Sequence, residues 1–266
     1  MSEIAAVASM PRGGPDASWL DRRLQTDVLE YTDRYDIPDD VKQKVITALD
    51  RIGTRTRQHE KNAHIALDLV SRTANPRILE LGAGHGKLSA EILRLHPTAT
   101  VTVSDLDPTS VANVAGGALG RHPRVRTQVV DATAIDAEDD SYDLVVFAQA
   151  FHHLPPAVAA RAIAEATRVG KRFLVIDLAR QSPVGFILTA LLLAPSAVAL
   201  VPLPSVRPLI HDGFISSLRA YSRSAFTALA AAAAPDIRIT FLPSEFRLGP
   251  RPTVVTFTRD AQAPRS

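Results

Sequence analysis

Three closely spaced glycines stand between a short apolar run and a helical pattern in ILELGAGHGKLS, residues 78–89. Gly82, Gly84 and Gly86 allow the backbone to approach a ligand closely. Exposed N–H groups at the start of the following helix favour an anionic group, either a carboxylate or a phosphate. The dinucleotide fingerprint G-x-G-x-x-G would need a glycine where Lys87 stands. The segment therefore predicts a ligand-binding turn, with a tight strand-to-helix connection that binds nothing as the alternative.

Two aspartates end the next two predicted strands. Asp105 closes TVTVSD, where a carboxylate can accept two hydrogen bonds from a ribose diol. Asp131 closes VRTQVVD and is followed by Ala132 and Thr133. Either acid taken alone is explained equally well as a helix cap or a solvated strand end. In combination with the glycine turn, they predict a nucleoside-binding edge of a sheet.

Together these residues resemble the class I S-adenosylmethionine (SAM)-dependent methyltransferases, and the resemblance covers roughly residues 75–180. It implies that SAM is the cofactor and S-adenosylhomocysteine (SAH) the product. A zwitterion carrying a sulfonium needs amide donors at one end and carboxylate acceptors at the other. The resemblance implies that the methionine end of SAM lies against Glu80, Gly82, Ala83 and Gly84. It also implies that Asp105 binds the ribose, that Leu106 and Ala132 flank the adenine, and that Asp131 accepts from the exocyclic amine of the adenine.

The segment YDLVVFAQAFHHLP is similar to the family's fourth strand and to the His-His-Leu element of many small-molecule methyltransferases. The resemblance implies that Ala148 and Gln149 lie beside the sulfonium, with His152 and His153 just beyond. A nucleic-acid amino-methyltransferase would carry an Asn/Asp-Pro-Pro-aromatic element here, which this sequence lacks. The histidines are candidates for a general base, and packing or capping is the alternative for each.

A later segment, LIHDGFISSLRAYSRSAF, is similar to an element of the ubiquinone/menaquinone-type methyltransferases associated with quinone and polyketide tailoring. We expect it to form a loop over the carboxyl edge of the sheet, where ligands bind in α/β proteins. His211, Arg219 and Tyr221 are therefore candidate catalytic or substrate-contacting residues. In the alternative, Arg219 pairs with Asp212 and Tyr221 packs below the next helix.

Short apolar runs alternating with helical patterns predict an α/β fold, a Rossmann-like seven-stranded sheet that is mostly parallel with an antiparallel last strand. We expect a flexible leader at 1–17, a helical cap at 18–74, a SAM-binding core at 75–259 with an apolar or lid insert at 183–221, and a flexible tail at 260–266. The predicted strands span residues 77–81, 100–105, 125–131, 142–148, 172–178, 237–242 and 252–259.

The stretch GFILTALLLAPSAVALVPLP, residues 185–204, is unusually apolar. It is about long enough to span a bilayer, but three prolines interrupt it and no cluster of cations flanks it. A lid over an apolar acceptor, a dimer surface and a buried helix pair are the three possibilities, with buried packing as the default. We expect this insert and the N-terminal helices together to cover an acceptor pocket.

The composition of the chain limits the classes of partner and of chemistry that we expect. The 266 residues carry 30 Lys+Arg against 28 Asp+Glu, a formal charge of +2, which implies no nucleic-acid partner. The absence of cysteine removes thiol and zinc-thiolate chemistry and is compatible with a reducing cytoplasm. The chain is predicted to be a cytoplasmic monomer or homodimer that methylates oxygen or carbon of a small metabolite by in-line transfer, without a metal or stable membrane insertion. The alternatives are an NAD(P)-dependent oxidoreductase and a SAM-binding regulator without catalysis.

Overall fold

One seven-stranded sheet organises the chain, with the strand order β3-β2-β1-β4-β5-β7-β6. In the computed structural model, the described residues are 3–34, 36–203, 206–243 and 252–259. β1 to β5 pair in parallel, and β7 is antiparallel to both β5 and β6, which confirms the predicted mixed sheet. The strands are β1 (Arg77–Leu81), β2 (Thr100–Asp105), β3 (Val125–Val129), β4 (Leu144–Ala148), β5 (Phe173–Leu178), β6 (Ile237–Leu242) and β7 (Pro252–Arg259).

Helices cover both faces of this sheet, as an apolar parallel sheet requires. One face packs against α4, α5 and α6, with Ala66 and Ile92 in that core. The other face packs against α7 and α10, with Ile163, Phe226 and Leu229 in the core. These helices are α4 (Gln58–Leu69), α5 (Lys87–Leu95), α6 (Pro108–Gly116), α7 (Pro156–Val169) and α10 (Arg223–Ala233).

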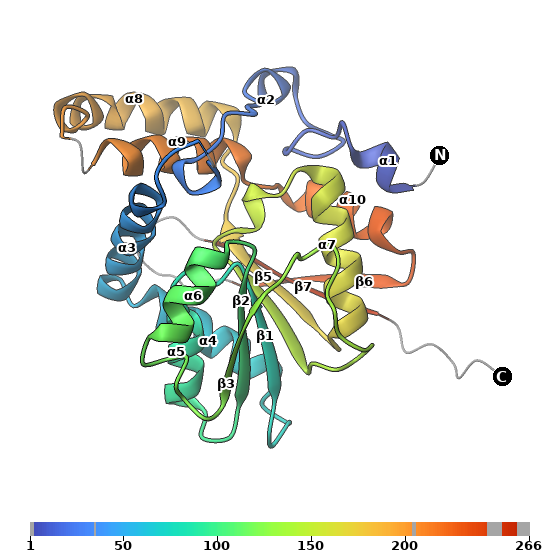
Figure 1. Cartoon of the computed structure of the whole chain (residues 1–266). Helices are drawn as coiled ribbons and strands as arrows, with labels where there is room; N and C mark the ends of the chain where they lie inside the picture. Colours follow the sequence, from blue (N-terminus) through green and yellow to red (C-terminus); the bar gives the residue numbers. More distant parts are fainter. Residues whose placement is uncertain (1–2, 35, 204–205, 244–251, 260–266) are drawn as a thin grey trace.

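The N-terminal segment lies at one end of the sheet together with α9, as Figure 1 shows. Its elements are α1 (Glu3–Val7), α2 (Trp19–Arg23), η1 (Tyr31–Asp33) and α3 (Asp39–Arg55). Within the helical cap expected at 18–74, α2 ends at Arg23 and an irregular connection follows. Pro38 is the residue immediately before α3.

The segment predicted as a flexible leader is instead attached to the body of the protein. Val7 is buried in the core beside α10. The Arg12 guanidinium donates to the backbone oxygens of His152 (2.6 Å) and Arg219 (3.0 Å), and it lies over the Tyr221 ring. Composition could not reveal these contacts, since their partners lie far along the chain. The predicted tail at 260–266 lies outside the described residues.

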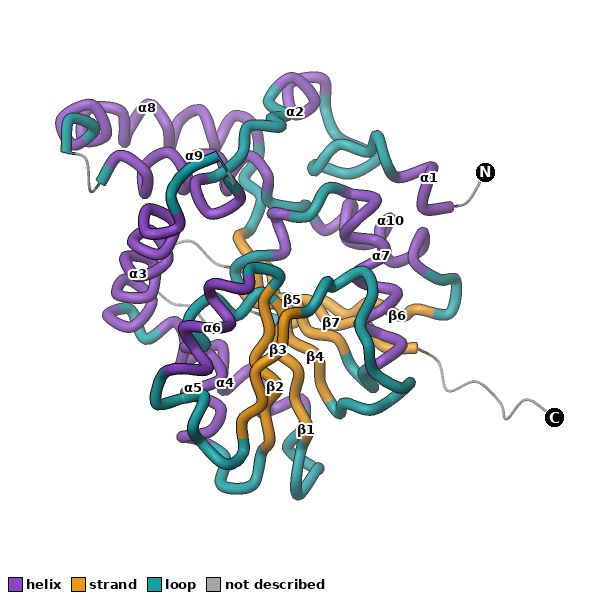
Figure 2. The backbone as a smooth tube through the Cα atoms, viewed as in Figure 1, coloured by secondary structure: helices purple, strands orange, loops and turns teal. Residues whose placement is uncertain are grey.

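The apolar insert differs most from expectation. Its main part is α8 (Pro183–Leu200), in which no residue is buried, so the default of buried packing is wrong. The following polar segment is not a loop but the helix α9 (Arg207–Arg219), on which α8 lies (Figure 2). In the described part of the chain, α8 alone is long and apolar enough to cross a membrane by length and composition. Leu191 and Leu192 are among its most exposed side chains.

Candidate active site

A single cavity of about 790 Å³ opens at the ends of β1, β2 and β4, within the size range of small-molecule sites. Its floor is the glycine turn after β1 and the loops after β2, β3 and β4. Its cover comes from η1, α3 and α9. We call the part around residues 80–84, 105–106, 131–132 and 148–149 the donor half. The acceptor half is the part around Glu30, Asp33, His152, His153 and Ser216.

The glycine turn has the backbone conformation that its sequence predicts. Gly82, Gly84 and Gly86 all have positive φ, at 61°, 54° and 69°. A Cβ atom on Gly82 would lie 2.6 Å from the Phe147 ring, so a side chain cannot enter without movement. The turn therefore presents backbone to the cavity, because glycine is required both by conformation and by space.

Asp105 is held at the edge of the cavity by backbone donors. Its two carboxylate oxygens accept from the N–H groups of Gly84 (2.8 Å) and Asp107 (2.9 Å). Burial raises the pKa of this carboxyl group despite these bonds. Asp131 is more exposed, and one of its oxygens accepts from the amide and hydroxyl of Thr133, both at 2.8 Å. Both carboxylates border the cavity at the predicted positions.

Glu80 stabilises the start of the helix that follows the glycine turn. Its carboxylate accepts from the amide of Ser89 at 3.0 Å and from the Ser89 hydroxyl, so it caps the first turn of α5. Burial raises the pKa of Glu80 to about 7. The side chain is buried and still borders the cavity, which gives it a structural role in addition to the predicted contact with the methionine end.

All ten predicted cofactor residues line this one cavity. Gln149 adds a strained feature, because it has a positive φ of 61° at the end of β4, and its N–H donates to the Ile176 oxygen. Such strain persists only where surrounding structure imposes it. The contacts of these residues with SAM remain predictions. The ten residues are Glu80, Gly82, Ala83, Gly84, Asp105, Leu106, Asp131, Ala132, Ala148 and Gln149.

The helix α3 covers the donor half, whereas we expected the N-terminal helices to cover the acceptor pocket. His85, in the glycine turn, has Nδ1 2.8 Å from Asp50 Oδ2 and Nε2 2.8 Å from Gln43 Oε1. These contacts join α3 to the turn, and Ile46 and Asp50 line the cavity. His85 thus holds α3 over the donor half.

The acceptor half contains a buried charged cluster. His152 Nδ1 lies 2.7 Å from Asp177 Oδ1, and the His152 amide donates to the other Asp177 oxygen at 2.7 Å. Its Nε2 faces Glu30 Oε1 at 3.6 Å. Burial opposes the charged imidazolium, but the Asp177 and Glu30 carboxylates outweigh it and raise the pKa of His152 to about 9.

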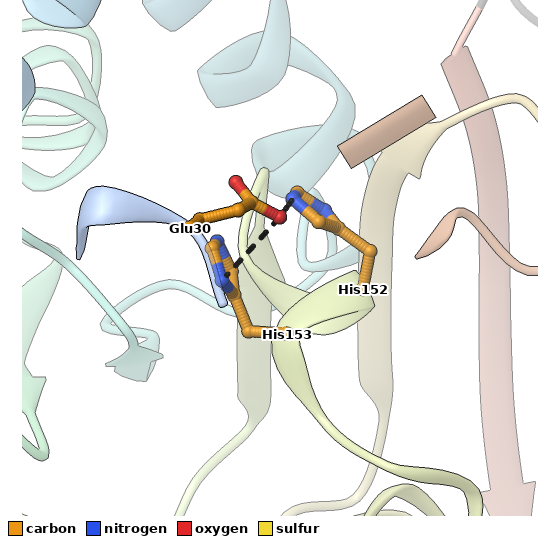
Figure 3. A group of neighbouring side chains, drawn as sticks. All are labelled: Glu30, His152 and His153. Carbon is orange, nitrogen blue, oxygen red and sulfur yellow. Dashed lines mark ion pairs between the residues drawn. The ribbon is translucent and has the colours of Figure 1, made fainter. Parts of the chain in front are cut away.

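His153 lies beside His152 and faces the same carboxylate. Its Nδ1 is 3.9 Å from Glu30 Oε1 and 2.8 Å from Asp33 Oδ1. Burial disfavours the Asp33 carboxylate, yet hydrogen bonds from His153 and Arg219 lower the pKa of Asp33 to about 2. Figure 3 shows Glu30, His152 and His153 pointing toward one another. Glu30 and Asp33 escaped sequence analysis because no motif marks them.

The other three catalytic candidates do not line the cavity. Tyr221 is buried and its hydroxyl donates to the Leu154 oxygen at 2.7 Å, which matches the packing alternative. Arg219 pairs with Asp33 at 2.5 Å, not with Asp212, and donates to the His153 oxygen. His211 has Nδ1 2.9 Å from Asp212 Oδ1. These three side chains support the acceptor half through other residues.

Comparison with known proteins finds methyltransferases. Residues 78–172 match the family described as a methyltransferase domain. Over this segment the chain is similar to class I methyltransferases. A malonyl-acyl-carrier protein O-methyltransferase of Geobacter sulfurreducens is 38% identical over 93 residues, which cover 35% of this chain and 34% of that protein. An uncharacterized methyltransferase of Mycobacterium tuberculosis is 31% identical over 123 residues, 46% of this chain and 48% of that protein.

Solved structures extend the likeness in fold over the rest of the chain. A plantazolicin methyltransferase in complex with SAH covers 97% of the chain and is itself covered to 98%, with a TM-score of 0.62 and 12% identity. A mitomycin 7-O-methyltransferase covers 78% of the chain, with 54% of its own length matched, a TM-score of 0.55 and 18% identity. At these identities the likeness shows the fold. The chain spans less than half the length of the curated relatives described above.

Proposed function

We propose that this protein is a methyltransferase that uses SAM to methylate oxygen or carbon of a small, apolar or aromatic metabolite by in-line displacement. The observation that carries the proposal is one cavity in which all ten predicted cofactor residues adjoin a separate set of polar side chains. Structural neighbours that act on natural products, one of them bound to SAH, support the same class of reaction.

The donor half supplies the groups that a sulfonium zwitterion needs. We propose that backbone N–H groups of the glycine turn bind the methionine carboxylate and that Asp105 accepts from the ribose hydroxyls. Asp131 would accept from the adenine amine. Ala148 and Gln149 would hold the sulfonium end, between the donor half and the acceptor half.

The acceptor half must align the acceptor and exclude water. Since the sulfonium is an activated donor, alignment is the main requirement, and orientation effects can supply roughly 7–11 kcal/mol. The Asp177 and Glu30 carboxylates raise the pKa of His152 to about 9, so in the metal-free protein its imidazolium can donate a hydrogen bond to the acceptor oxygen. His153 is the proposed base for a phenol or enol, and Asp33 orients its ring.

Two measurements test this proposal. Calorimetry of the full chain with SAM, SAH and NAD should show binding of the first two and none of NAD. Transfer of tritiated methyl from SAM into an extract of candidate metabolites should then give a labelled small molecule. Asp105→Ala should lose both signals while keeping its circular dichroism spectrum. SAM binding without any labelled product would favour the regulatory alternative, and NAD binding without SAM binding would contradict the proposal.

A further inference from the structure

We propose that Glu30, His152 and His153 bind a divalent first-row transition-metal ion at the acceptor half of the cavity. This site goes beyond the proposed methyl transfer, which needs no metal, and it can be tested without SAM or an acceptor. Glu30 immediately precedes η1, and His152 and His153 belong to η2 (Phe151–His153). Only the fold brings these two segments together.

The ligand atoms already lie close to a common point. Glu30 Oε1 is 3.6 Å from His152 Nε2 and 3.9 Å from His153 Nδ1, and all the ligand atoms lie within 4.8 Å of one another. Two atoms that each lie about 2.1 Å from one ion are at most about 4.2 Å apart. A side-chain shift of about half an ångström therefore suffices to place an ion between them (Figure 3).

Two of the three ligand atoms are buried without a hydrogen bond in the described structure. They are Glu30 Oε1 and His152 Nε2, whose side chains are only 4% exposed. The third atom, His153 Nδ1, forms an ion pair with Asp33 Oδ1 at 2.8 Å, which a bound ion would have to displace. A buried polar atom without a partner costs about 1–3 kcal/mol, so two of them that face each other require an explanation, and a shared cation would supply one.

Glu30 and His152 each make a second hydrogen bond that orients the side chain, as is usual for metal ligands. His152 uses Nδ1 on Asp177, which leaves Nε2 toward Glu30, the arrangement of a carboxylate–histidine–metal unit. Glu30 uses its other oxygen, Oε2, to accept from the Ser216 hydroxyl at 2.6 Å. His152 and Glu30 are therefore each oriented by a second group and cannot turn away without losing a hydrogen bond.

The charges around the site include two opposing groups. The Asp33 and Asp177 carboxylates border the two histidines and favour a cation. The Arg219 guanidinium lies 3.5 Å from Glu30 Oε1, although its closer contact at 2.5 Å is to Asp33, and the Arg12 guanidinium donates to the backbone oxygen of His152 at 2.6 Å. The three carboxylates of Glu30, Asp33 and Asp177 outnumber these two cations.

Two imidazoles and a carboxylate are the donors preferred by Zn²⁺, Fe²⁺, Mn²⁺ and Co²⁺. Three protein ligands leave coordination positions open toward the cavity. An acceptor with a hydroxyl, keto or enol oxygen could occupy one of them, in which case His152 and His153 act as ligands and not as base. The proposal thus assigns the acceptor class as one that presents an oxygen to a metal.

Cobalt binding to the full chain, first treated with a chelator, tests the site. Addition of Co²⁺ should produce visible absorption bands that saturate at one ion per chain and should raise the melting temperature. His153→Ala and Glu30→Gln should weaken Co²⁺ affinity by at least about 10-fold. His64→Ala, which removes an exposed histidine of α4 outside the cluster, should leave the affinity unchanged.

Two results would overturn the proposal. Wild-type protein that binds no Co²⁺ and no Zn²⁺ would show that the cluster is an ion-pair network in which His152 is simply protonated. Equal affinity in wild type, His153→Ala and Glu30→Gln would place any bound ion elsewhere. If Glu30→Gln does not fold, the Co²⁺ affinity of His153→Ala tests the proposal alone. The His153 side chain is 20% exposed and is therefore less critical for packing. None of these readouts depends on methyl transfer.

Discussion

The donor half and the acceptor half of the cavity are built in different ways. The donor half is formed by consecutive strand ends between residues 80 and 149, and its key contacts involve backbone N–H groups and glycine conformation. The acceptor half is formed by side chains from distant segments, since Glu30 accepts from the hydroxyl of Ser216, 186 positions further along the chain.

This difference has a physical consequence. A site formed by backbone groups tolerates few substitutions at its glycines. Its geometry depends little on which side chains pair with one another. A site made of buried charges depends on every partner, because an unpaired buried charge is costly. We therefore expect the two halves to respond differently to substitution, and the following predictions are ordered from the largest expected effect to the smallest.

Gly82→Val should damage the donor half most. The new side chain would have a positive φ and would collide with the Phe147 ring at 2.6 Å. Backbone strain and overpacking together should lower the free energy of unfolding by about 2–6 kcal/mol and abolish SAM binding. Urea denaturation and calorimetry measure the two effects. Gly116→Ala is the control, since nothing lies within 4 Å of its Cβ position. Retained SAM affinity in Gly82→Val would refute the role of the turn.

Arg219→Met should damage the acceptor half and spare the donor half. Its loss leaves Asp33 and Glu30 without their buried cation, which should cost about 3–5 kcal/mol in the free energy of unfolding. SAM affinity of the folded variant should stay within a factor of about two, because Arg219 does not line the cavity. Arg121→Met, at the surface, should change the free energy by less than about 0.5 kcal/mol. A large loss of SAM affinity would show that the halves are coupled.

Glu80 should make the stability of the SAM-free protein depend on pH. Its folded-state pKa of about 7 exceeds its ordinary value of 4.5, so the folded state favours the protonated form. Stability from this group is complete below pH 4.5 and is lost as pH rises through 7, by up to about 3 kcal/mol. Glu80→Gln should remove this part of the pH dependence, as shown by melting curves between pH 5 and 8. Identical pH profiles for the two proteins would contradict the raised pKa.

Asp105→Asn should weaken SAM binding without unfolding the protein. The amide oxygen can still accept from Gly84, but the loss of charge should lower SAM affinity by about 10- to 100-fold, equivalent to 1.5–3 kcal/mol. Calorimetry gives the affinity, and Asp139→Asn at an exposed position serves as the matched change of charge. An unchanged affinity would remove Asp105 from the cofactor site.

The exposed helix α8 should be the least sensitive region. Replacing Leu191 and Leu192 together by serine should change the free energy of unfolding by less than about 0.5 kcal/mol, because both side chains are already exposed. Leu229→Ala, on the buried face of α10, should cost about 2–5 kcal/mol by comparison. A comparable loss in both proteins would show that α8 is buried in solution.

Much of the fold follows from local patterns. The bounds predicted for β1, β2, β6 and β7 agree with the structure, because alternating and continuous apolar runs report directly on a sheet covered by helices. The turn glycines were also predictable, since only glycine adopts their backbone conformation readily. The α9 helix was missed because its polar residues, with Gly213 among them, read as a connection.

Local sequence also determined the donor half, whose residues follow directly from strand ends that a parallel sheet must place side by side. Only the tertiary structure decided that Glu30 meets His152 and His153, that Tyr221 turns into the core, and that α8 lies on the surface. The reason is that these outcomes depend on packing between distant segments, where the partner of a buried charge or an apolar face is set by three-dimensional proximity and leaves no periodic mark in the chain.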